Sequence, residues 1–367
     1  MPLSVVHVSA HYPPYVGGLE KVVGSLASYR NERALAVRVL TSQDRDPESP
    51  QFSDAAFVER LASIEVAHTT IMPTLPMRLF RLGDDSIVHL HVAQAFAPEA
   101  VYLAHVVRGL PYVAHLHIDV GPSGGAGFLL KAYKPLVLGR VLRGAQAVIV
   151  FTREQQKTIQ SKYGIDPRRI AVIPNGVDES FFFTHPRRLH ARPRLLFVGR
   201  LAVQKNIPML LHALDGISER FDTTIVGSGS LDVELKKLAQ SLELKNVRFH
   251  GRADGEDLME IFRQADVVVL PSEREGMPLV LLEAMAMGLP TVATDIAGNR
   301  DVVVDRETGI LVPLDDSNAM QKALLDVVSD EEQYSRMSKA AQSRARRYSW
   351  DTIGQEFEEV YAHAART

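Results

Sequence analysis

The sequence predicts an α/β protein built from two doubly wound parallel sheets. Its 367 residues are enough for two domains at about 150 residues each. Short β-branched runs alternate with longer helical patterns, and this alternation starts again in the second half of the chain. The runs are apolar almost throughout, as strands covered by helices on both faces should be. Ligands of such sheets bind beyond the carboxyl ends of the strands.

The first series of strands predicts an N-terminal domain over residues 1–180. We expect its strands at 4–9, 35–40, 86–92, 112–118 and 145–151. Right-handed crossovers then give one parallel sheet. We also expect the C-terminal helix, within 350–367, to join this domain.

The second series predicts a C-terminal domain over residues 194–349. Its strands are expected at 194–198, 223–226, 247–250, 267–270 and 291–294. The segment 181–193 is rich in Arg, His and Pro and has no clear period, so it is predicted to be the linker.

Composition excludes several classes of function. The chain has 41 Lys and Arg residues and 44 Asp and Glu residues, so it has no overall positive potential that would attract nucleic acid. The absence of cysteine excludes disulfides, thiolate zinc sites and cysteine nucleophiles. No leader pattern or long apolar stretch is seen, so a cytoplasmic protein is expected. Contact with a membrane surface is left open but not favoured, because Pro135 would interrupt the basic helix around it.

A helix start in the second domain has the features of a phosphate site. Pro278 suits the first helical position and Gly288 suits the end. Gly276 lets a ligand approach the mouth of the helix. The N–H groups of Leu279 and Val280, together with the positive end of the helix dipole, would hold a phosphate there.

Two acids flank this helix start. Glu275 lies in the loop before it, and Glu283 lies more than a turn into the helix, among apolar residues. Carboxylates accept hydrogen bonds from sugar hydroxyls. The pair is therefore suited to holding two parts of a glycosylated nucleotide, although acids near a helix start are also common without a ligand.

Cations and glycines mark two further loops. Arg200 and Lys205 follow the predicted strand 194–198, and two cations suit a diphosphate better than a single carboxylate. In the first domain, Gly17 and Gly18 precede a helix predicted from residue 21, where the backbone could approach an anion. A plain turn and solvated surface cations are the simpler alternatives.

On these motifs the chain resembles the retaining glycosyltransferases of family four. The resemblance covers nearly the whole length and rests on Gly17-Gly18-Leu19-Glu20, Ile173-Pro174-Asn175-Gly176-Val177-Asp178, Gly199-Arg200-Leu201 with Lys205-Asn206, and Glu275 with Glu283 eight positions later. It implies the GT-B fold, in which two Rossmann-like domains face each other across a cleft. It also implies transfer of a hexosyl group from a nucleoside diphosphate sugar to an acceptor hydroxyl, with retention of anomeric configuration.

The resemblance implies a role for each matched residue. Glu275 would contact the transferred sugar, Arg200 and Lys205 would neutralise the diphosphate, and His117 would line the reaction centre; these four are the predicted catalytic residues. Residues predicted to bind the donor are Gly17, Gly18, Arg252, Gly276, Met277, Pro278, Leu279, Val280 and Glu283. No Asp-x-Asp metal motif is seen at the implied site, so we expect no metal and no cofactor. The base, the sugar and the acceptor, whether a small molecule, a glycan or a lipid-linked group, stay open.

Two histidines at the end of a first-domain strand are candidates for the reaction centre. His115 and His117 alternate along one strand and should point to one face, and we favour His117 because it lies nearer the carboxyl end. His7, His89 and His91 are predicted to be core residues. Pro278 stands where many members have glycine, which removes one N–H, and Ala297-Gly298 replaces a common Gly-Gly.

Three other functions compete with this prediction. Gly227-Ser228-Gly229 follows a strand as in nicotinamide-dependent oxidoreductases, but Asp232 stands where the third glycine belongs. A two-domain sugar-binding receptor would normally carry an export signal. A nucleotide-sugar 2-epimerase with a similar fold is the nearest enzymatic alternative.

Overall fold

A computed structural model of the chain describes residues 3–15, 17–44, 54–66, 69–117, 134–183 and 186–366. Its contacts divide the chain into two compact units. Unit 1 contains Met1–Gly176 and Trp350–Thr367, and unit 2 contains Val177–Ser349. The chain therefore passes into unit 2 four residues before the predicted boundary.

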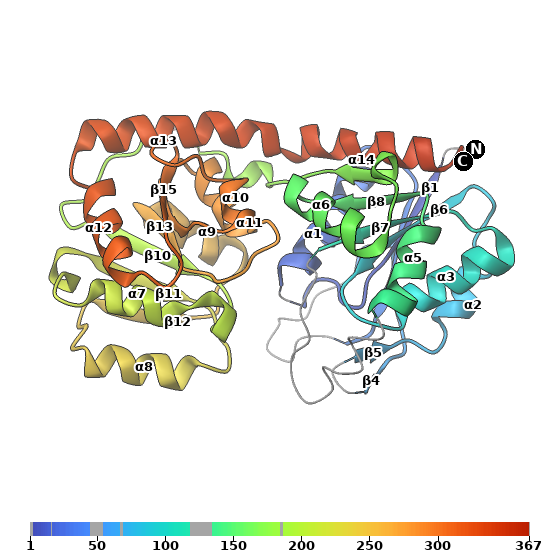
Figure 1. Cartoon of the computed structure of the whole chain (residues 1–367), viewed down its shortest axis with the longest axis horizontal. Helices are drawn as coiled ribbons and strands as arrows, with labels where there is room; N and C mark the ends of the chain where they lie inside the picture. The colour runs from blue at the N-terminus through green and yellow to red at the C-terminus, as the bar shows by residue number, and fades with distance from the viewer. Residues whose placement is uncertain are drawn as a thin grey trace. The chain divides into compact units, whose positions relative to one another are not determined.

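Unit 1 is built on a seven-stranded parallel sheet with the order β3-β2-β1-β6-β7-β8-β9 (Figure 1). The strands are β1 (Ser4–Val8), β2 (Val37–Ser42), β3 (Val58–Leu61), β6 (Ser86–Val92), β7 (Tyr112–Leu116), β8 (Ala147–Val150) and β9 (Ile170–Val172). The five predicted strands are present, with ends shifted by up to two residues. β3, β9 and a small antiparallel pair, β4 (Ile64–Val66) with β5 (Thr69–Ile71), were not predicted.

Helices cover both faces of this sheet. They are α1 (Gly18–Glu32), α2 (Leu75–Leu79), α3 (Ala97–Arg108), α5 (Gly139–Gly144), α6 (Arg153–Tyr163) and α14 (Trp350–Ala364). Local sequence sets their ends: at α6 the Thr152 side chain accepts a hydrogen bond from the Gln155 N–H, and left-handed Gly164 ends the helix.

The C-terminal helix α14 completes unit 1. It packs against α1 and β7, and Figure 1 shows it along the sheet of this unit. The buried guanidinium of Arg30 pairs with Glu358, and the Trp350 ring lies against Gly176, where a side chain would not fit. Residues 350–367 thus belong to the same core as the N-terminal half.

Unit 2 has a six-stranded parallel sheet with the order β12-β11-β10-β13-β14-β15. The strands are β10 (Arg194–Val198), β11 (Asp222–Val226), β12 (Val247–Gly251), β13 (Val267–Leu270), β14 (Thr291–Thr294) and β15 (Gly309–Val312). In this doubly wound order, strands are added toward one edge of the sheet up to the third strand and toward the other edge from the fourth. The reversal lies between the first and fourth strands, here β10 and β13. The carboxyl ends of these two strands flank the position where such folds bind ligands.

The helices of unit 2 also lie on both faces of their sheet (Figure 1). They are α7 (Ile207–Leu214), α8 (Asp232–Ser241), α9 (Gly255–Gln264), α10 (Leu279–Ala286), α11 (Ala297–Arg300), α12 (Ser317–Val327) and α13 (Glu331–Ala345). Pro278 is the N-cap of α10 in an extended conformation, which corrects its predicted place inside the helix. Over the described part of the chain, no helix is both long and apolar enough to span a bilayer.

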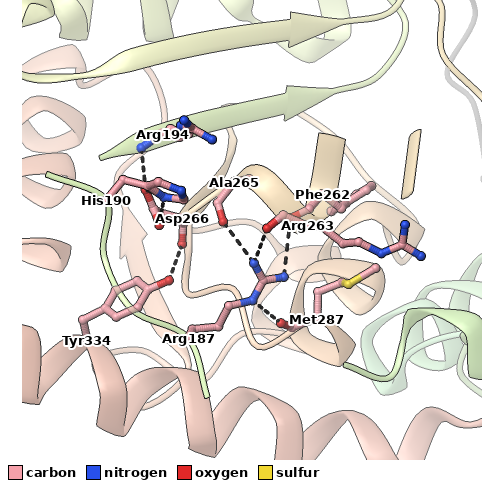
Figure 2. Close-up of polar contacts among 9 residues, drawn as sticks. All are labelled: Arg187, His190, Arg194, Phe262, Arg263, Ala265, Asp266, Met287 and Tyr334. Atoms are coloured by element: carbon pink, nitrogen blue, oxygen red, sulfur yellow. Dashed lines mark hydrogen bonds and ion pairs between the residues drawn. The ribbon is translucent and has the colours of Figure 1, made fainter. Parts of the chain in front are cut away.

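The segment predicted as a linker is packed onto unit 2, as Figure 2 shows. Arg187 donates to the carbonyl oxygens of Met287 at 2.9 Å and Arg263 at 2.6 Å, at the carboxyl ends of α10 and α9. Burial lowers the pKa of the Arg187 guanidinium. Buried Asp266 accepts hydrogen bonds from the Arg194 N–H at 2.7 Å and contacts His190 Nδ1 at 2.9 Å. These contacts make 186–194 a fixed part of the second core.

Candidate functional site

Two predicted catalytic residues meet at the carboxyl edge of unit 2, between β10 and β13. The short 3₁₀ turn η4 (Val203–Lys205) follows β10 and runs beside the loop that follows β13. The Glu273 N–H donates to the Gln204 carbonyl at 2.9 Å. Beside this hydrogen bond, Lys205 Nζ lies 2.5 Å from Glu275 Oε1. A backbone hydrogen bond therefore fixes the position at which lysine and glutamate pair.

This ion pair is shielded from water. The Lys205 side chain is 16% exposed and the Glu275 side chain 7%. A charge pair in such a place is screened less than a surface pair, so an incoming anion would feel the lysine strongly. Arg200, just after β10, is exposed.

Gly298 supports the loop that carries Glu275. A Cβ atom at residue 298 would lie 2.6 Å from the carbonyl oxygen of Glu275 and 2.7 Å from that of Gly276. Only glycine lets α11 approach the loop this closely. Where Ala297-Gly298 replaces the common Gly-Gly of the family pattern, the chain thus keeps the glycine that contacts the loop carrying Glu275.

A buried hydrogen-bond chain ties the same loop to the sheet. Asn299 Nδ2 donates to the Thr294 carbonyl at 2.9 Å, and Thr294 Oγ1 donates to the Ser272 carbonyl at 2.5 Å. All three residues are fully buried. Sequence reasoning missed this support; the one available signal was a threonine at the end of β14 followed by asparagine in the next turn.

The start of α10 presents backbone donors beside this loop. Leu281 is the first residue whose N–H bonds to the Pro278 carbonyl, so the helix does not use the N–H groups of Leu279 and Val280. Gly276, Met277 and Pro278 are buried. Glu283, on the helix itself, is 5% exposed.

The glycines that suggested a dinucleotide site have a packing role. Gly227 and Gly229 lie against the backbone oxygens of Gly199 and Leu201, where side chains would collide. The Leu201 N–H donates to the Ser228 carbonyl at 2.9 Å. This close packing supports the turn that carries Arg200, and it accounts for the motif without a nicotinamide cofactor.

The remaining donor-binding predictions lie on different elements. Arg252 directly follows β12 and is half-buried. In unit 1, Gly17 is the N-cap of α1 and Gly18 is its exposed first residue. The Glu20 carboxylate lies against Gly17, so an acid stands next to the place predicted for a phosphate.

His117 follows β7 in unit 1. It is 7% exposed, and its Nε2 lies 3.0 Å from His91 Nδ1. Burial lowers the pKa of His117 to about 3, which makes it a neutral imidazole at pH 7. His115 is fully buried one pleat earlier on the same face, as the alternation predicted. The glycine-rich loop 121–128, whose sequence makes it a candidate for acceptor choice, lies outside the described residues.

Comparison with known proteins gives two family matches that together cover most of the chain. Residues 16–181 match the model described as "Glycosyltransferase Family 4", and residues 181–344 match "Glycosyl transferases group 1". The chain is 31% identical to a phosphatidyl-myo-inositol mannosyltransferase of Mycobacterium leprae over 366 residues, 95% of this chain and 94% of the relative. It is also 31% identical to a D-inositol 3-phosphate glycosyltransferase of Xylanimonas cellulosilytica, over 77% of this chain and 73% of the relative.

Solved structures share the fold at lower identity. Sucrose-phosphate synthase from Thermosynechococcus elongatus superposes with a TM-score of 0.81 at 22% identity, covering 98% of both chains. Anabaena HepE in complex with UDP superposes with a TM-score of 0.78 at 20% identity, over 98% of this chain and 100% of that one.

Proposed function

The chain belongs to the family of group 1 and family 4 glycosyltransferases, and we propose that it transfers a hexosyl group from a nucleoside diphosphate sugar to an acceptor hydroxyl with retention of anomeric configuration. The α/β architecture with two parallel sheets and the likeness to glycosyltransferases of the GT-B fold confirm the predicted fold class. The donor, the stereochemistry and the roles of single residues are parts of the proposal.

The Lys205–Glu275 pair at the switch point of unit 2 is the observation that carries the proposal. Ligands of doubly wound sheets bind at this point, and here it offers a shielded cation, a carboxylate and the unused N–H groups at the start of α10. A donor diphosphate would take over Lys205 from Glu275. Glu275 would then be released to accept hydrogen bonds from the sugar.

Charge development on the leaving group explains why cations matter. As the sugar–phosphate bond breaks, negative charge grows on the diphosphate, and groups already aimed at that charge lower the barrier. We assign this role to Lys205, Arg200 and the N–H groups of Leu279 and Val280. These groups would take the place of a divalent ion, so activity should persist in a chelator.

The proposed proton path needs no protein nucleophile. The acceptor hydroxyl attacks the anomeric carbon from the face that the diphosphate leaves, and the departing phosphate oxygen takes the hydroxyl proton. The C–O bond to phosphate breaks as the new glycosidic C–O bond forms, and configuration is retained. His117 would donate a hydrogen bond to a sugar oxygen.

The other assignments follow from the positions of the residues. Glu283, nearly buried on α10, would accept hydrogen bonds from the ribose hydroxyls, and backbone near Arg252 would hold the base. Gly17 and Gly18 would let the backbone of unit 1 approach the donor. Because HepE was solved in complex with UDP and both relatives are named for inositol compounds, UDP-sugars and inositol hydroxyls come first in any panel.

A donor panel followed by a matched pair of lysine variants tests the proposal. Thermal-shift screening of UDP- and GDP-sugars identifies the donor, because a bound ligand raises the melting temperature. Lys205→Met should then lower kcat about 100-fold or more. Lys236→Met removes an exposed Lys–Asp ion pair in the same unit and should leave kcat unchanged.

Two results would contradict the proposal. One is near-normal turnover by folded Lys205→Met. The other is a product whose anomeric configuration, read by proton NMR, is inverted relative to the donor. Conversion of the donor without any acceptor would point instead to the epimerase alternative.

A further inference from the structure

Five buried histidines share one face of the unit 1 sheet. They come from three adjacent strands, and in the strand register His7 lies opposite His89 while His91 lies opposite His115. Each is between 0% and 7% exposed. The five residues are His7 on β1, His89 and His91 on β6, His115 on β7, and His117 just after β7.

Three of the rings form a continuous hydrogen-bonded row that ends at His117. His7 Nδ1 lies 3.0 Å from His91 Nε2, and His91 Nδ1 lies 3.0 Å from His117 Nε2. We call this row the His7 chain. Both ring nitrogens of His91 take part in the His7 chain, and His117 takes part through Nε2. Nδ1 is therefore the His117 nitrogen that could contact a substrate.

The other two rings form a second row, hydrogen-bonded separately, whose His115 ring stacks on His117 with centroids 4.2 Å apart. Tyr361 Oη on α14 lies 2.6 Å from His89 Nδ1, and His89 Nε2 lies 3.2 Å from His115 Nδ1. This row, the His89 chain, is covered by Phe357. It shares its strands and its burial with the His7 chain, and it therefore provides a matched control.

The protons along the His7 chain are coupled. Burial lowers the pKa of all three rings, so each is neutral and carries one N–H. Since each inner hydrogen bond needs one donor and one acceptor, all three rings must carry their proton on the same nitrogen type. Either every Nδ1 is protonated, or every Nε2 is.

The surroundings of His7 favour protonation at Nδ1. His7 Nε2 is buried and has no hydrogen-bond partner within the described ranges. A buried N–H group without a partner is costly and is rarer in folded proteins than an acceptor without one. Protonation at Nδ1 avoids such an N–H group and leaves only an acceptor lone pair at Nε2.

A metal ion fits the same rings less well. Nitrogens of His7, His89 and His91, and those of His91, His115 and His117, lie within 4.8 Å of one another. However, the 3.0 Å separations are those of N–H···N hydrogen bonds, in which the ring nitrogens already pair with one another, and Arg30 adds a positive charge. A buried dication would have no anionic ligand in either group.

We propose that His91 and His7 are positioning residues for His117. Through the His7 chain they hold its ring in one orientation and in one tautomer, with Nε2 accepting from His91 and Nδ1–H presented as a hydrogen-bond donor to a sugar oxygen. The inference rests on the proposed function only in placing His117 at the reaction centre. The state of the His117 ring is a property of the free protein.

Nitrogen NMR of histidine-labelled protein tests the tautomer without substrate. Long-range ¹H–¹⁵N spectra at pH 7.5, with the His117 signals assigned from His117→Gln, should show a neutral ring protonated at Nδ1. In His7→Leu, two rings away, the His117 nitrogens should shift toward the average of two tautomers. In Tyr361→Phe, which removes the hydroxyl at the far end of the His89 chain and keeps the ring, they should not move.

Kinetics and metal analysis complete the test. His7→Leu should lower kcat about 3- to 10-fold with little change in donor KM, and Tyr361→Phe should change neither by more than about twofold. A wild-type His117 protonated at Nε2, or one equivalent of zinc in the purified protein, would overturn the inference, and both are properties of the wild-type protein. Normal turnover by His117→Gln with the expected spectrum would instead count against the reaction-centre role of His117.

Discussion

Mild acid should unfold unit 1 before unit 2. Burial lowers the pKa of all five sheet histidines, to about 3 for His7 and His117, whereas an unfolded chain has a value near 6.5. Between these values the unfolded state binds more protons than the folded state, so stability falls as the pH falls. The full stability of unit 1 is present above pH 6.5 and is lost progressively below it.

The magnitude follows from linkage. At pH 5.5, one unit below the unfolded value, each histidine that stays neutral in the folded state costs about 1.4 kcal/mol. Five such residues cost up to about 7 kcal/mol relative to pH 8, which is comparable with the whole stability of a typical domain. Most carboxylates stay ionised at pH 5.5, so the histidines should dominate this window.

The chain carries its own probe for unit 1. Trp350 is the only tryptophan, and it is 8% exposed against Gly176 in unit 1. Urea titrations at pH 7.5, 6.5 and 5.5, followed by tryptophan fluorescence, should show the midpoint falling steeply with acid. Far-UV circular dichroism, which sees both units, should retain a second transition that moves much less.

Two variants isolate the cause. His115→Phe removes one titrating ring and should reduce the loss of unfolding free energy between pH 7.5 and 5.5 by about 1.4 kcal/mol. His212→Gln changes an exposed histidine of unit 2 and should leave that loss unchanged. A tryptophan transition with the same urea midpoint from pH 8 to pH 5 would refute the reasoning.

Further predictions concern the candidate site of unit 2 and Arg187 in the segment 186–194. Glu275→Gln should lower kcat about 10²-fold. Glu283→Gln should mainly raise donor KM, by an amount equivalent to about 1.5–3 kcal/mol of binding free energy. Steady-state kinetics separates the two effects, and equal effects on kcat would contradict the roles assigned. Gly298→Ala should push the Glu275 loop and lower kcat about 10- to 100-fold while circular dichroism stays unchanged, so normal turnover would show that the loop tolerates the contact. Arg187→Met should lower the unfolding free energy of unit 2 in urea by about 3 kcal/mol. Substitution of its exposed neighbour, Arg188→Met, should not. Equal stabilities of the two variants would mean that the contacts of Arg187 with the carbonyl oxygens contribute little.

Sequence patterns predicted strand bounds best where a short apolar run lies between clear turn residues. β10, β13 and β14 have the predicted bounds, because each is a short apolar run between clear turn residues. β3 was missed because its charged Glu59 and Arg60 lie at a sheet edge and pair with other residues, which hides its apolar character. β9 has only three residues, too few to show a period.

The site was predictable in its chemistry but not in its support. Motif spacing marked Lys205 and Glu275, which are 70 positions apart, but nothing in the sequence showed that they pair. Such contacts arise from the order of the strands, which periodicity does not give. The same holds for the histidines: alternation placed His115 and His117 on one face, but only the neighbouring strands brought His91 within hydrogen-bond distance.

The return of α14 to unit 1 sets the order in which the protein can be completed on the ribosome. Residues 350–367 are translated only after all of unit 2, yet they supply the Glu358 partner of Arg30 and the Tyr361 hydroxyl that contacts His89. Until then, the histidine face of the first sheet lacks the cover that Phe357 and Tyr361 of α14 provide. Unit 2, in contrast, is one uninterrupted stretch of the chain. The N-terminal half is therefore made first and completed last.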